Sequence, residues 1–361
     1  MRDLPSRRLS RLVLRAALQC QKLFRHIGPQ PVTRMRWDEF RNKMESFIAF
    51  EYADLILRFS DEPVLSLQKL IAKAETLGNP ARVFAIEGVA YRLAKSDLEG
   101  NLTSGGVPSL QDCADLGPGI LVLLHAGLGL AVAESVLSSM DKRESGCSEL
   151  LEHVTELCRQ NAQPGYEGVA FEALGFIART LYPDWIGDID RYLSANEEAL
   201  AHFWHGVGRG TYFAPENASP FRSAPWRAVE ICLRRTPHEE ARQNAMAGLA
   251  WAFIATNLGQ PEIVANFLRH HAAEVSANSG FVAGVGSAAI FWGEVCPGDA
   301  RLAALLQYDP AEIGLAPDIW NRYVQGPFED ALRNGSLLQQ VASPEELFRV
   351  RVEASKKRKG A

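Results

Sequence analysis

Five ionisable residues of this 361-residue chain lie inside otherwise apolar, glycine-bearing segments. Glu87 and Glu167 each precede the glycine of an "EGVA" segment, His125 lies in "LLHAGLG", and His205 and Arg209 lie in "HGVGRG". Burial raises the pKa of a carboxyl group and a nearby cation lowers it, so such residues can be tuned to donate or accept a proton. We predict acid–base catalysis, in which Arg209 stabilises developing negative charge while Glu87, Glu167, His205 or His125 moves a proton.

Most of these residues also have a purely structural interpretation. Glu87 and Glu167 can be satisfied by Arg92, Arg179 or a neighbouring helix end, and a histidine in an apolar helix is commonly a hydrogen-bonded core residue. Arg209 is the exception, because an arginine between glycines in an apolar helix needs an anionic or carbonyl partner, or a cavity to face.

A set of aromatic residues accompanies the ionisable ones. Tyr91, Phe171 and Trp251 each follow a glycine of the same short motif by three residues, and Tyr212 and Phe213 follow "HGVGRG". If the helices that carry them surround a space, these rings form a wall suited to a large, planar, mostly apolar molecule. We predict that these five residues bind substrate; the alternative is that they are ordinary core aromatics.

Other catalytic and cofactor motifs are missing from the sequence. It contains no Ser-His-Asp order, nucleophile elbow or Cys-His signature. The segment "HGVGRG" lacks both the preceding β-run and the glycine pattern of a phosphate-binding loop. His202 and His205 share a helix face with Glu198, but no further ligand is suitably spaced. We therefore expect neither a metal nor a cofactor.

The segments expected to form the helices that carry these residues recur along the chain about every forty residues. A glycine followed by Val or Leu and a small residue appears six times, at intervals of 36 to 42 residues. The six glycines are Gly88, Gly127, Gly168, Gly206, Gly248 and Gly284. Such a period, with helical apolar spacing, is typical of stacked two-helix units. We predict an all-α fold of stacked helical-hairpin repeats, an open α-solenoid or a closed α/α array, around glycine-bearing inner helices.

Glycine inside a helix costs about 1 kcal/mol relative to alanine. We expect close contact between inner helices to offset this cost, because glycine lets two helix backbones approach. Clusters of Gly, Pro, Asn and Ser between the six motifs predict the turns. We predict a basic N-terminal helix or extension over residues 1–40, the helical-repeat domain over 41–300, and a C-terminal helical segment with a basic tail over 301–361.

Charge and hydropathy restrict the partners. A formal net charge of −5 and a pI near 6.0 give no general attraction to phosphate backbones, which argues against DNA or RNA. The uncharged run from Gly119 to Ala133 contains a histidine and is shorter than the ~20 residues that span a bilayer. We expect a buried helix there and no stable transmembrane span.

The six cysteines are widely dispersed, which indicates a reducing compartment. We therefore expect a cytoplasmic protein. Its main partner would be a large apolar or polycyclic small molecule, with pathway proteins or a second copy of the chain as further partners.

Five segments carry a resemblance: "ARVFAIEGVAY" (81–91), "LLHAGLGLAVA" (123–133), "GYEGVAFEALG" (165–175), "HGVGRGTYF" (205–213) and "RQNAMAGLAWAF" (242–253). As a set, and in this order, they resemble a bacterial family of uncharacterised domains associated with enediyne biosynthesis and other natural-product gene clusters. The resemblance spans most of residues 20–295.

Residue by residue, the family motifs fall on Gly206, Gly208, Arg209, Tyr212 and Phe213, on His125, Gly127 and Gly129, and on Glu87 and Gly88. The chain departs from the family's R-x-D-L-W-S-G. It has Asn244, Ala245, Met246 and Ala247 before Gly248, and so lacks an acid, a tryptophan and a hydroxyl.

The resemblance implies tailoring or assembly of a polycyclic polyketide, with cyclisation or carbon–carbon bond formation as the activity. Together with the predicted aromatic wall, it leads us to expect an enzyme that acts on a polycyclic apolar substrate in a helix-lined pocket. The alternatives are a non-catalytic protein that binds and sequesters such a metabolite, and a helical-repeat scaffold for pathway proteins.

Overall fold

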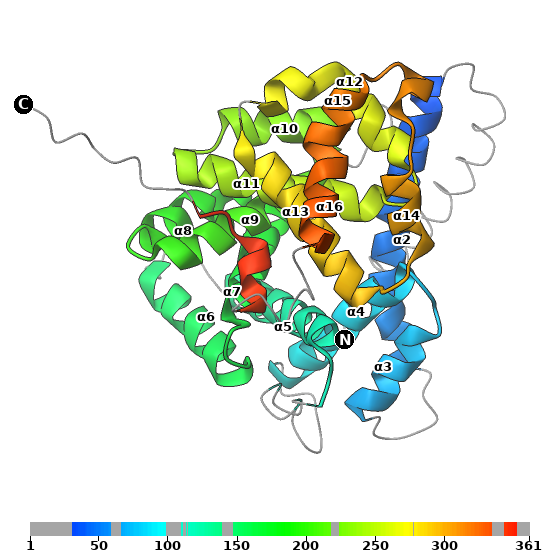
Figure 1. Cartoon of the computed structure of the whole chain (residues 1–361). Helices are drawn as coiled ribbons and strands as arrows, with labels where there is room; N and C mark the ends of the chain where they lie inside the picture. Colours follow the sequence, from blue (N-terminus) through cyan, green and yellow to red (C-terminus); the bar gives the residue numbers. More distant parts are fainter. Residues whose placement is uncertain are drawn as a thin grey trace, which may run out of the picture.

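The computed structural model describes residues 31–58, 66–98, 110, 113, 115–138, 147–217, 224–276, 278–333 and 343–351. Within these ranges the chain is helical throughout and contains no β-strand (Figure 1), which confirms the all-α prediction. The predicted basic extension over residues 1–30 and the basic tail over residues 352–361 lie outside the described residues.

The α-helices are α2 (Pro31–Arg58), α3 (Leu67–Glu75), α4 (Ala81–Leu98), α5 (Pro118–Ser138), α6 (Cys147–Asn161), α7 (Glu167–Leu181), α8 (Ile186–Leu193), α9 (Glu197–Phe213), α10 (Ala224–Arg234), α11 (Glu239–Asn257), α12 (Pro261–Ser276), α13 (Ser279–Val295), α14 (Ala300–Leu306), α15 (Pro317–Trp320) and α16 (Gly326–Arg333). Short 3-10 turns are η2 (Pro183–Trp185), η3 (Pro215–Asn217), η4 (Pro310–Ile313) and η6 (Pro344–Phe348), and η5 (Asn321–Gln325) is a π-helical turn.

The inner helices contact one another in chain order. Helix α2 lies on α4, α4 on α5, α5 on α7, α7 on α9, α9 on α11, and α11 on α13. Helix α13 also contacts α5, and α2 also contacts α11, so the succession surrounds a common interior. Helices α3, α6, α8, α10 and α12 pack against its outer side (Figure 1).

Glycines set the spacing between the inner helices. A β-carbon on Gly206 would fall 1.8 Å from the carbonyl oxygen of Glu172, and one on Gly248 would fall 1.8 Å from that of His205. These separations leave no room for any side chain, because real β-carbons do not approach other atoms so closely. The helices at these two crossings therefore touch backbone to backbone, as predicted.

The other glycines of the motif behave similarly, with one exception. A β-carbon on Gly88, Gly127 or Gly284 would fall 2.1–2.3 Å from a backbone oxygen of the adjacent inner helix. Beside Gly168 the space is filled instead by the imidazole of His202. Close helix contact thus accounts for five of the six glycines, and the sixth accommodates a buried side chain.

Helix α5 is the most apolar of the inner helices. Among the described residues it is the one helix long and apolar enough to cross a membrane, and 83% of its most apolar window is buried inside the protein. It contacts α4, α7 and α13. Its apolar surface is therefore covered by neighbouring helices.

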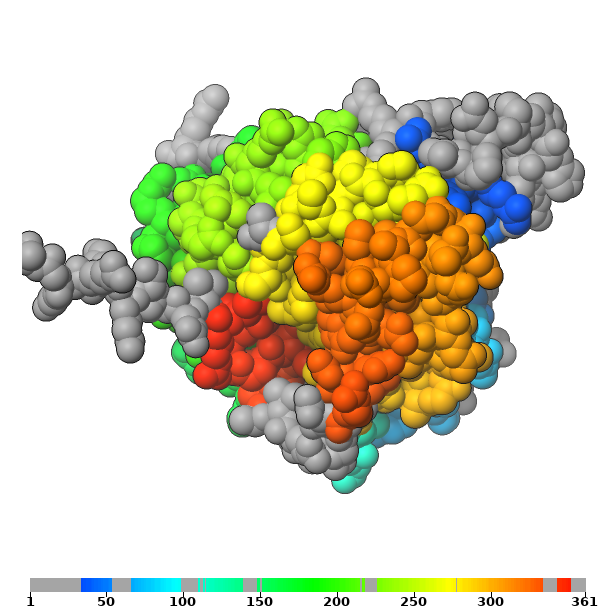
Figure 2. All heavy atoms as spheres, turned by 45° about the horizontal axis from the view of Figure 1, so that its top comes forward, coloured from blue at the N-terminus to red at the C-terminus, as the bar shows by residue number. Residues whose placement is uncertain are grey.

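Helices on both sides of the boundaries predicted at residues 40 and 300 are in contact with the inner helices. Helix α2 runs through residue 40 without a break. On the C-terminal side, α16 packs against α13, and η6 contacts α7, α9 and α13. Figure 2 shows η6, in red, seated between the green and yellow-orange parts of the surface.

A buried polar network fixes α2 against α9 and α11. Lys43, only 1% exposed, contacts Glu39 at 3.1 Å and lies 3.6 Å from the centre of the Tyr212 ring. The Tyr212 hydroxyl donates to Glu39 at 2.9 Å and accepts from the Asn257 amide at 2.9 Å. Burial lowers the pKa of Lys43, and the Glu39 carboxylate opposes that shift.

Two glycines of α13 provide a matched test of the helix spacing. Gly284→Ala places a β-carbon 2.1 Å from the Ala247 carbonyl oxygen, whereas Gly286→Ala meets nothing closer than 3.8 Å. We expect Gly284→Ala to lower the free energy of unfolding by about 2 to 3 kcal/mol through overpacking. We expect Gly286→Ala to leave it unchanged or raise it by up to about 1 kcal/mol through helix propensity. Urea unfolding followed by circular dichroism measures both, and equal effects would contradict the proposed contact.

Candidate functional site

The interior enclosed by the inner helices contains a cavity of about 810 Å³. Its lining comes from α2, α4, α5, α7, α9, α11 and α13, together with Phe348 of η6. Phe47, Ile48 and Leu181 belong to the same lining and are 38%, 39% and 54% exposed. These three apolar side chains therefore mark the open end of the cavity.

Aromatic rings form much of the cavity wall. At the end near α2, the Phe213 ring lies 5.5 Å from Phe47 and 6.1 Å from Phe176. Deeper in, the Trp251 ring lies 5.1 Å from Phe291 and 5.9 Å from Phe348. All of these residues line the cavity, so a ring-bearing molecule inside it would meet aromatic faces and edges from several helices.

A buried charge cluster interrupts this apolar wall. The Arg209 guanidinium contacts the Glu172 carboxylate (Nε to Oε1, 3.0 Å) and the Glu87 carboxyl group (Nη1 to Oε1, 3.5 Å). The Glu172 Oε1 atom also lies 3.3 Å from Nδ1 of His205. Each of the four residues is at most 8% exposed. The guanidinium carbon lies 4.6 Å from the centre of the Phe176 ring, a cation–π contact.

The glycine crossings bring these charges together. Gly206 abuts the backbone of Glu172, and Arg209 follows it by less than one helical turn. Gly127 abuts the backbone of Glu87. The Gly206 crossing therefore sets Glu172 of α7 beside Arg209 of α9, while the Gly127 crossing fixes α4, which carries Glu87, against α5.

Burial shifts the pKa values of two members of the cluster. It raises the pKa of Glu87; Arg209 opposes this shift and Glu172 adds to it. Burial lowers the pKa of His205, although the hydrogen bond to Glu172 opposes that shift. Both shifts are toward the uncharged form, which for Glu87 is a carboxyl group that can donate a proton.

Four buried polar atoms at this end of the cavity find no hydrogen-bond partner among the described residues. They are Nε and Nη2 of Arg209, Nε1 of Trp251 and Nε2 of His205. Nε of Arg209 forms the 3.0 Å ion pair with Glu172 but not a hydrogen bond to it. An unpaired buried polar group costs about 1 to 3 kcal/mol. Three of these atoms belong to residues that line the cavity, Arg209 and Trp251.

Near the open end, polar groups are paired with one another. The Tyr91 hydroxyl donates to Glu134 and accepts from Lys95 at 3.0 Å, and Lys95 contacts Glu134 at 2.6 Å. Arg92 contacts Glu51 at 2.9 Å. Burial and Glu134 both raise the pKa of Tyr91, so its phenol stays protonated.

The structure brings half of the sequence-predicted site residues to the cavity wall: Glu87, Arg209, Tyr91, Trp251 and Phe213. His205 stands directly behind the wall, in contact with Glu172. The remaining four are Glu167, His125, Phe171 and Tyr212, and none of them lines the cavity.

His125 and Glu167 are occupied by local structure. His125 contacts the Leu121 carbonyl through Nδ1 at 2.7 Å, accepts from the Gln163 backbone N–H at Nε2, and stacks on Tyr166. The Glu167 carboxylate accepts from the backbone N–H of Gly165 at 2.9 Å. The positions of His125 and Glu167 therefore fit hydrogen-bonded structural residues, the alternative to a catalytic role.

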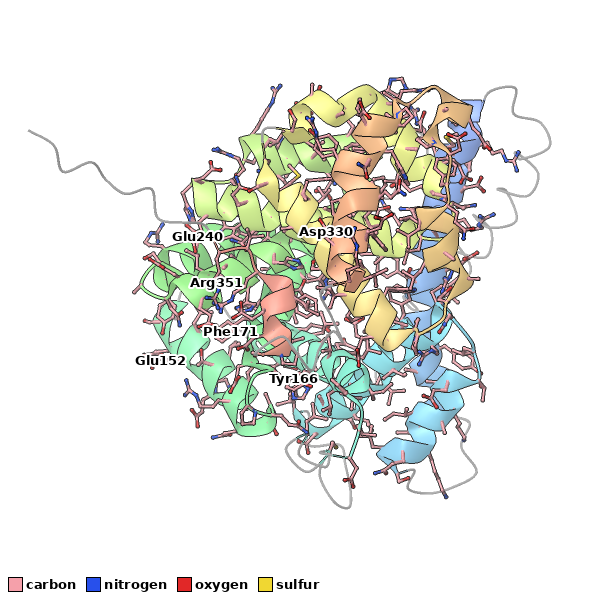
Figure 3. All side chains as sticks on the ribbon, in the orientation of Figure 1. Glu152, Tyr166, Phe171, Glu240, Asp330 and Arg351 are labelled. Carbon is pink, nitrogen blue, oxygen red and sulfur yellow. The ribbon has the colours of Figure 1, made fainter. Side chains whose placement is uncertain are left out.

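The two remaining aromatics are held elsewhere. Phe171 is partly buried against the core on α7 and is labelled in Figure 3 beside η6. Tyr212 is fully buried in the Lys43 network described above.

Several residues of the site were missed by the sequence analysis, among them Glu172, Phe176 and Phe348. Glu172 lies four residues after Gly168, one helical turn along the same face, and is followed at the same spacing by Phe176. The residues that stand four positions after each motif glycine, instead of three, include Glu172. Phe348 has no such signal, because it comes from the segment assigned to a separate C-terminal region.

Across the residues that the structure describes, no group of three His, Cys, Asp or Glu side chains is arranged to hold a metal ion. Cys113, Cys158, Cys232 and Cys296 are buried free thiols. No family model, curated protein or solved structure matches this chain.

His125 predicts an acid-dependent loss of stability. Burial lowers its pKa from 6.5 to about 4, so the unfolded chain takes up a proton in this range that the native state excludes. The native state should lose about 1.4 kcal/mol per pH unit as the pH falls below 6.5. Comparison with His125→Gln by urea unfolding isolates this residue: the stability advantage of the original chain should shrink by about 2 kcal/mol between pH 6.5 and pH 5.

A stability difference between the original chain and His125→Gln that does not change with pH would contradict the lowered pKa of His125. So would an imidazole resonance of His125 that titrates near 6.5 in the folded protein.

Proposed function

We propose that this protein binds a large, ring-bearing, mostly apolar molecule in the cavity and promotes a proton-transfer step in its cyclisation or carbon–carbon bond formation. The biological setting that we propose is tailoring or assembly in natural-product biosynthesis. One observation carries the proposal: a carboxyl group with a raised pKa, Glu87, lies beside the Arg209 guanidinium in the wall of an aromatic cavity.

The size and lining of the cavity support a ligand of this class. A volume of about 810 Å³ lies within the range of cavities that hold drug-sized and larger molecules. Phe176, Phe213, Trp251 and Phe348 offer aromatic surface on several sides. The polar groups near the open end are paired with one another, whereas the unpaired donors of Arg209 and Trp251 lie together, the arrangement that orients an otherwise apolar ligand.

The charge cluster supports acid catalysis in particular. A neutral Glu87 can donate its proton to a carbonyl oxygen, while Arg209 stabilises the negative charge that develops on that oxygen and the carboxylate that the transfer leaves on Glu87. Glu172 holds Arg209 in place at 3.0 Å and contacts His205, so it is a positioning residue. The surrounding rings keep water away from the reacting atoms.

The difference from the resembling family at residue 244 does not change the lining of the cavity. Asn244, which stands where the family has an acid, is fully buried; its amide oxygen accepts from the backbone N–H of Val350 at 2.6 Å. It does not line the cavity. The replacement of the acid by Asn244 therefore affects how the C-terminal segment packs against α11.

A finer description of the fold belongs to this proposal. We interpret the inner helices as units of about forty residues, stacked in chain order and curled around the cavity as a closed array. The contacts of α13 with α5 and of α2 with α11 support closure, and an enclosed interior supports small-molecule binding over a scaffold role on an open concave face.

The second candidate function is sequestration without turnover. It is favoured by the pairing of Arg209 with two carboxyl groups, which leaves the site largely charge-balanced before any ligand enters. A protein of this kind would retain its ligand unaltered.

Glu87→Gln separates the two functions. We expect the protein purified from its own host to retain one ring-bearing molecule per chain by native mass spectrometry. In Glu87→Gln the shape is kept and the proton donor is lost, so we expect the retained molecule to be the unconverted precursor, with turnover slowed by about 10²–10⁴-fold. A cyclisation conserves mass, so chromatographic retention and ultraviolet absorption of the extracted molecule are the measurements that distinguish the two forms.

The matched control is Glu167→Gln, an equivalent substitution away from the cavity, which should retain the same molecule as the original chain. An identical molecule in all three proteins would favour sequestration over catalysis. Co-purified polypeptides with no small molecule would favour the scaffold.

A further inference from the structure

Two residues at the inner end of the cavity, Arg209 and Trp251, carry hydrogen-bond donors that no described residue satisfies. Nη2 of Arg209 and Nε1 of Trp251 are shielded from solvent, and neither has an acceptor among the described residues. Both residues are more than nine-tenths buried and both line the cavity. The Arg209 guanidinium carbon lies 6.0 Å from the centre of the Trp251 ring, so the two donors belong to one neighbourhood.

Helix packing holds this pair in place. Arg209 is fixed by Glu172 on one side and rests on the Phe176 ring on the other. The Trp251 ring is held between Phe291 and Phe348. Because both side chains are confined, the donors are positioned in advance for an acceptor, which limits the entropy lost on binding.

The charge balance selects the kind of acceptor. Two carboxyl groups, those of Glu87 and Glu172, already lie within 3.5 Å of the guanidinium. An anionic ligand group would add negative charge to a buried site whose single cation is already paired, and that charge would not be compensated. A neutral acceptor oxygen satisfies the donors without this penalty.

We infer that Arg209 and Trp251 form a subsite for the neutral carbonyl oxygen of a ring ketone, quinone or similar polycyclic ligand. This inference rests on the proposed function, since it assumes that a ring-bearing molecule occupies the cavity. It adds the functional group by which that molecule is oriented and the two residues that recognise it. The carbonyl then lies at the end of the cavity where Glu87 is located, as protonation of its oxygen requires.

Two probes of nearly equal size and shape test the subsite on the full-length protein. 9-Fluorenone carries a ring carbonyl and fluorene carries a methylene group in its place. We expect the original chain to bind fluorenone about tenfold more tightly than fluorene by equilibrium dialysis, because only the ketone accepts the two hydrogen bonds. Infrared difference spectra of bound fluorenone should show the carbonyl stretch at lower frequency than in an apolar solvent.

Trp251→Phe removes the indole N–H and keeps an aromatic ring. We expect the preference for fluorenone over fluorene to fall to about threefold and the carbonyl band to move back to higher frequency. The smaller ring removes apolar contact from both probes alike, so the ratio of the two affinities is the readout. Trp320→Phe is the matched control: Trp320 is also buried with an unpartnered indole N–H, but it does not line the cavity. That variant should behave as the original chain does.

The possible failures are distinguishable. Equal binding of both probes with an unshifted carbonyl band would overturn the carbonyl subsite and leave the proposed function standing; the infrared measurement needs no variant. Tighter binding of fluorene-9-carboxylate than of fluorenone would overturn the choice of a neutral acceptor. If no ring-bearing probe enters the cavity, the proposed function itself is contradicted, and the subsite with it.

Discussion

The structure depends on backbone contact between successive inner helices at their glycines. At Gly206 and Gly248 no side chain of any size separates one helix from the next. Helices this close bring together residues that lie beside the crossing on each partner, so the spacing that forms the core also assembles the site. Glu172 lies at the Gly206 crossing and Arg209 stands three residues beyond it, which is why a carboxylate and a guanidinium meet inside an apolar protein.

The charge cluster is hard to explain as a device for stability. A buried ion pair loses the hydration of both ions, and well-packed apolar residues in its place are often at least as stable. Here two carboxyl groups share one guanidinium, and Nη2 of Arg209 stays unpaired. Burial also raises the pKa of Glu87, a shift toward its neutral form. Unsatisfied donors and a shifted carboxyl pKa in a cavity wall are features expected where a ligand completes the arrangement.

The glycine motif and the helical spacing around it were enough to predict the all-α class and the close helix contacts, because glycines mark the positions where helix backbones touch. They also singled out Arg209, which the structure places in the cavity wall. Which ionisable residue meets Arg209 could not be predicted, since Glu167 and Glu172 differ by little more than one turn of α7 and only the rotation of that helix decides between them. The structural role of His125 could not be predicted either, because its hydrogen-bond donor, the backbone N–H of Gln163, is 38 residues away in the chain. Phe348 enters the wall from a part of the chain that carries no repeat signal.

The C-terminal segment gives the cavity a wall that the inner helices alone do not supply. Phe348 reaches the Trp251 ring, while Arg349 contacts Glu198 at 2.9 Å and Val350 is bound by Asn244. These contacts tie the segment to α9 and α11, the helices that carry Arg209 and Trp251. Because Asn244 holds Val350 at this junction, a change at Asn244, outside the cavity, is coupled to the position of the Phe348 ring inside it. The shape of the cavity can therefore be altered by how the segment docks, without any change in the charged residues.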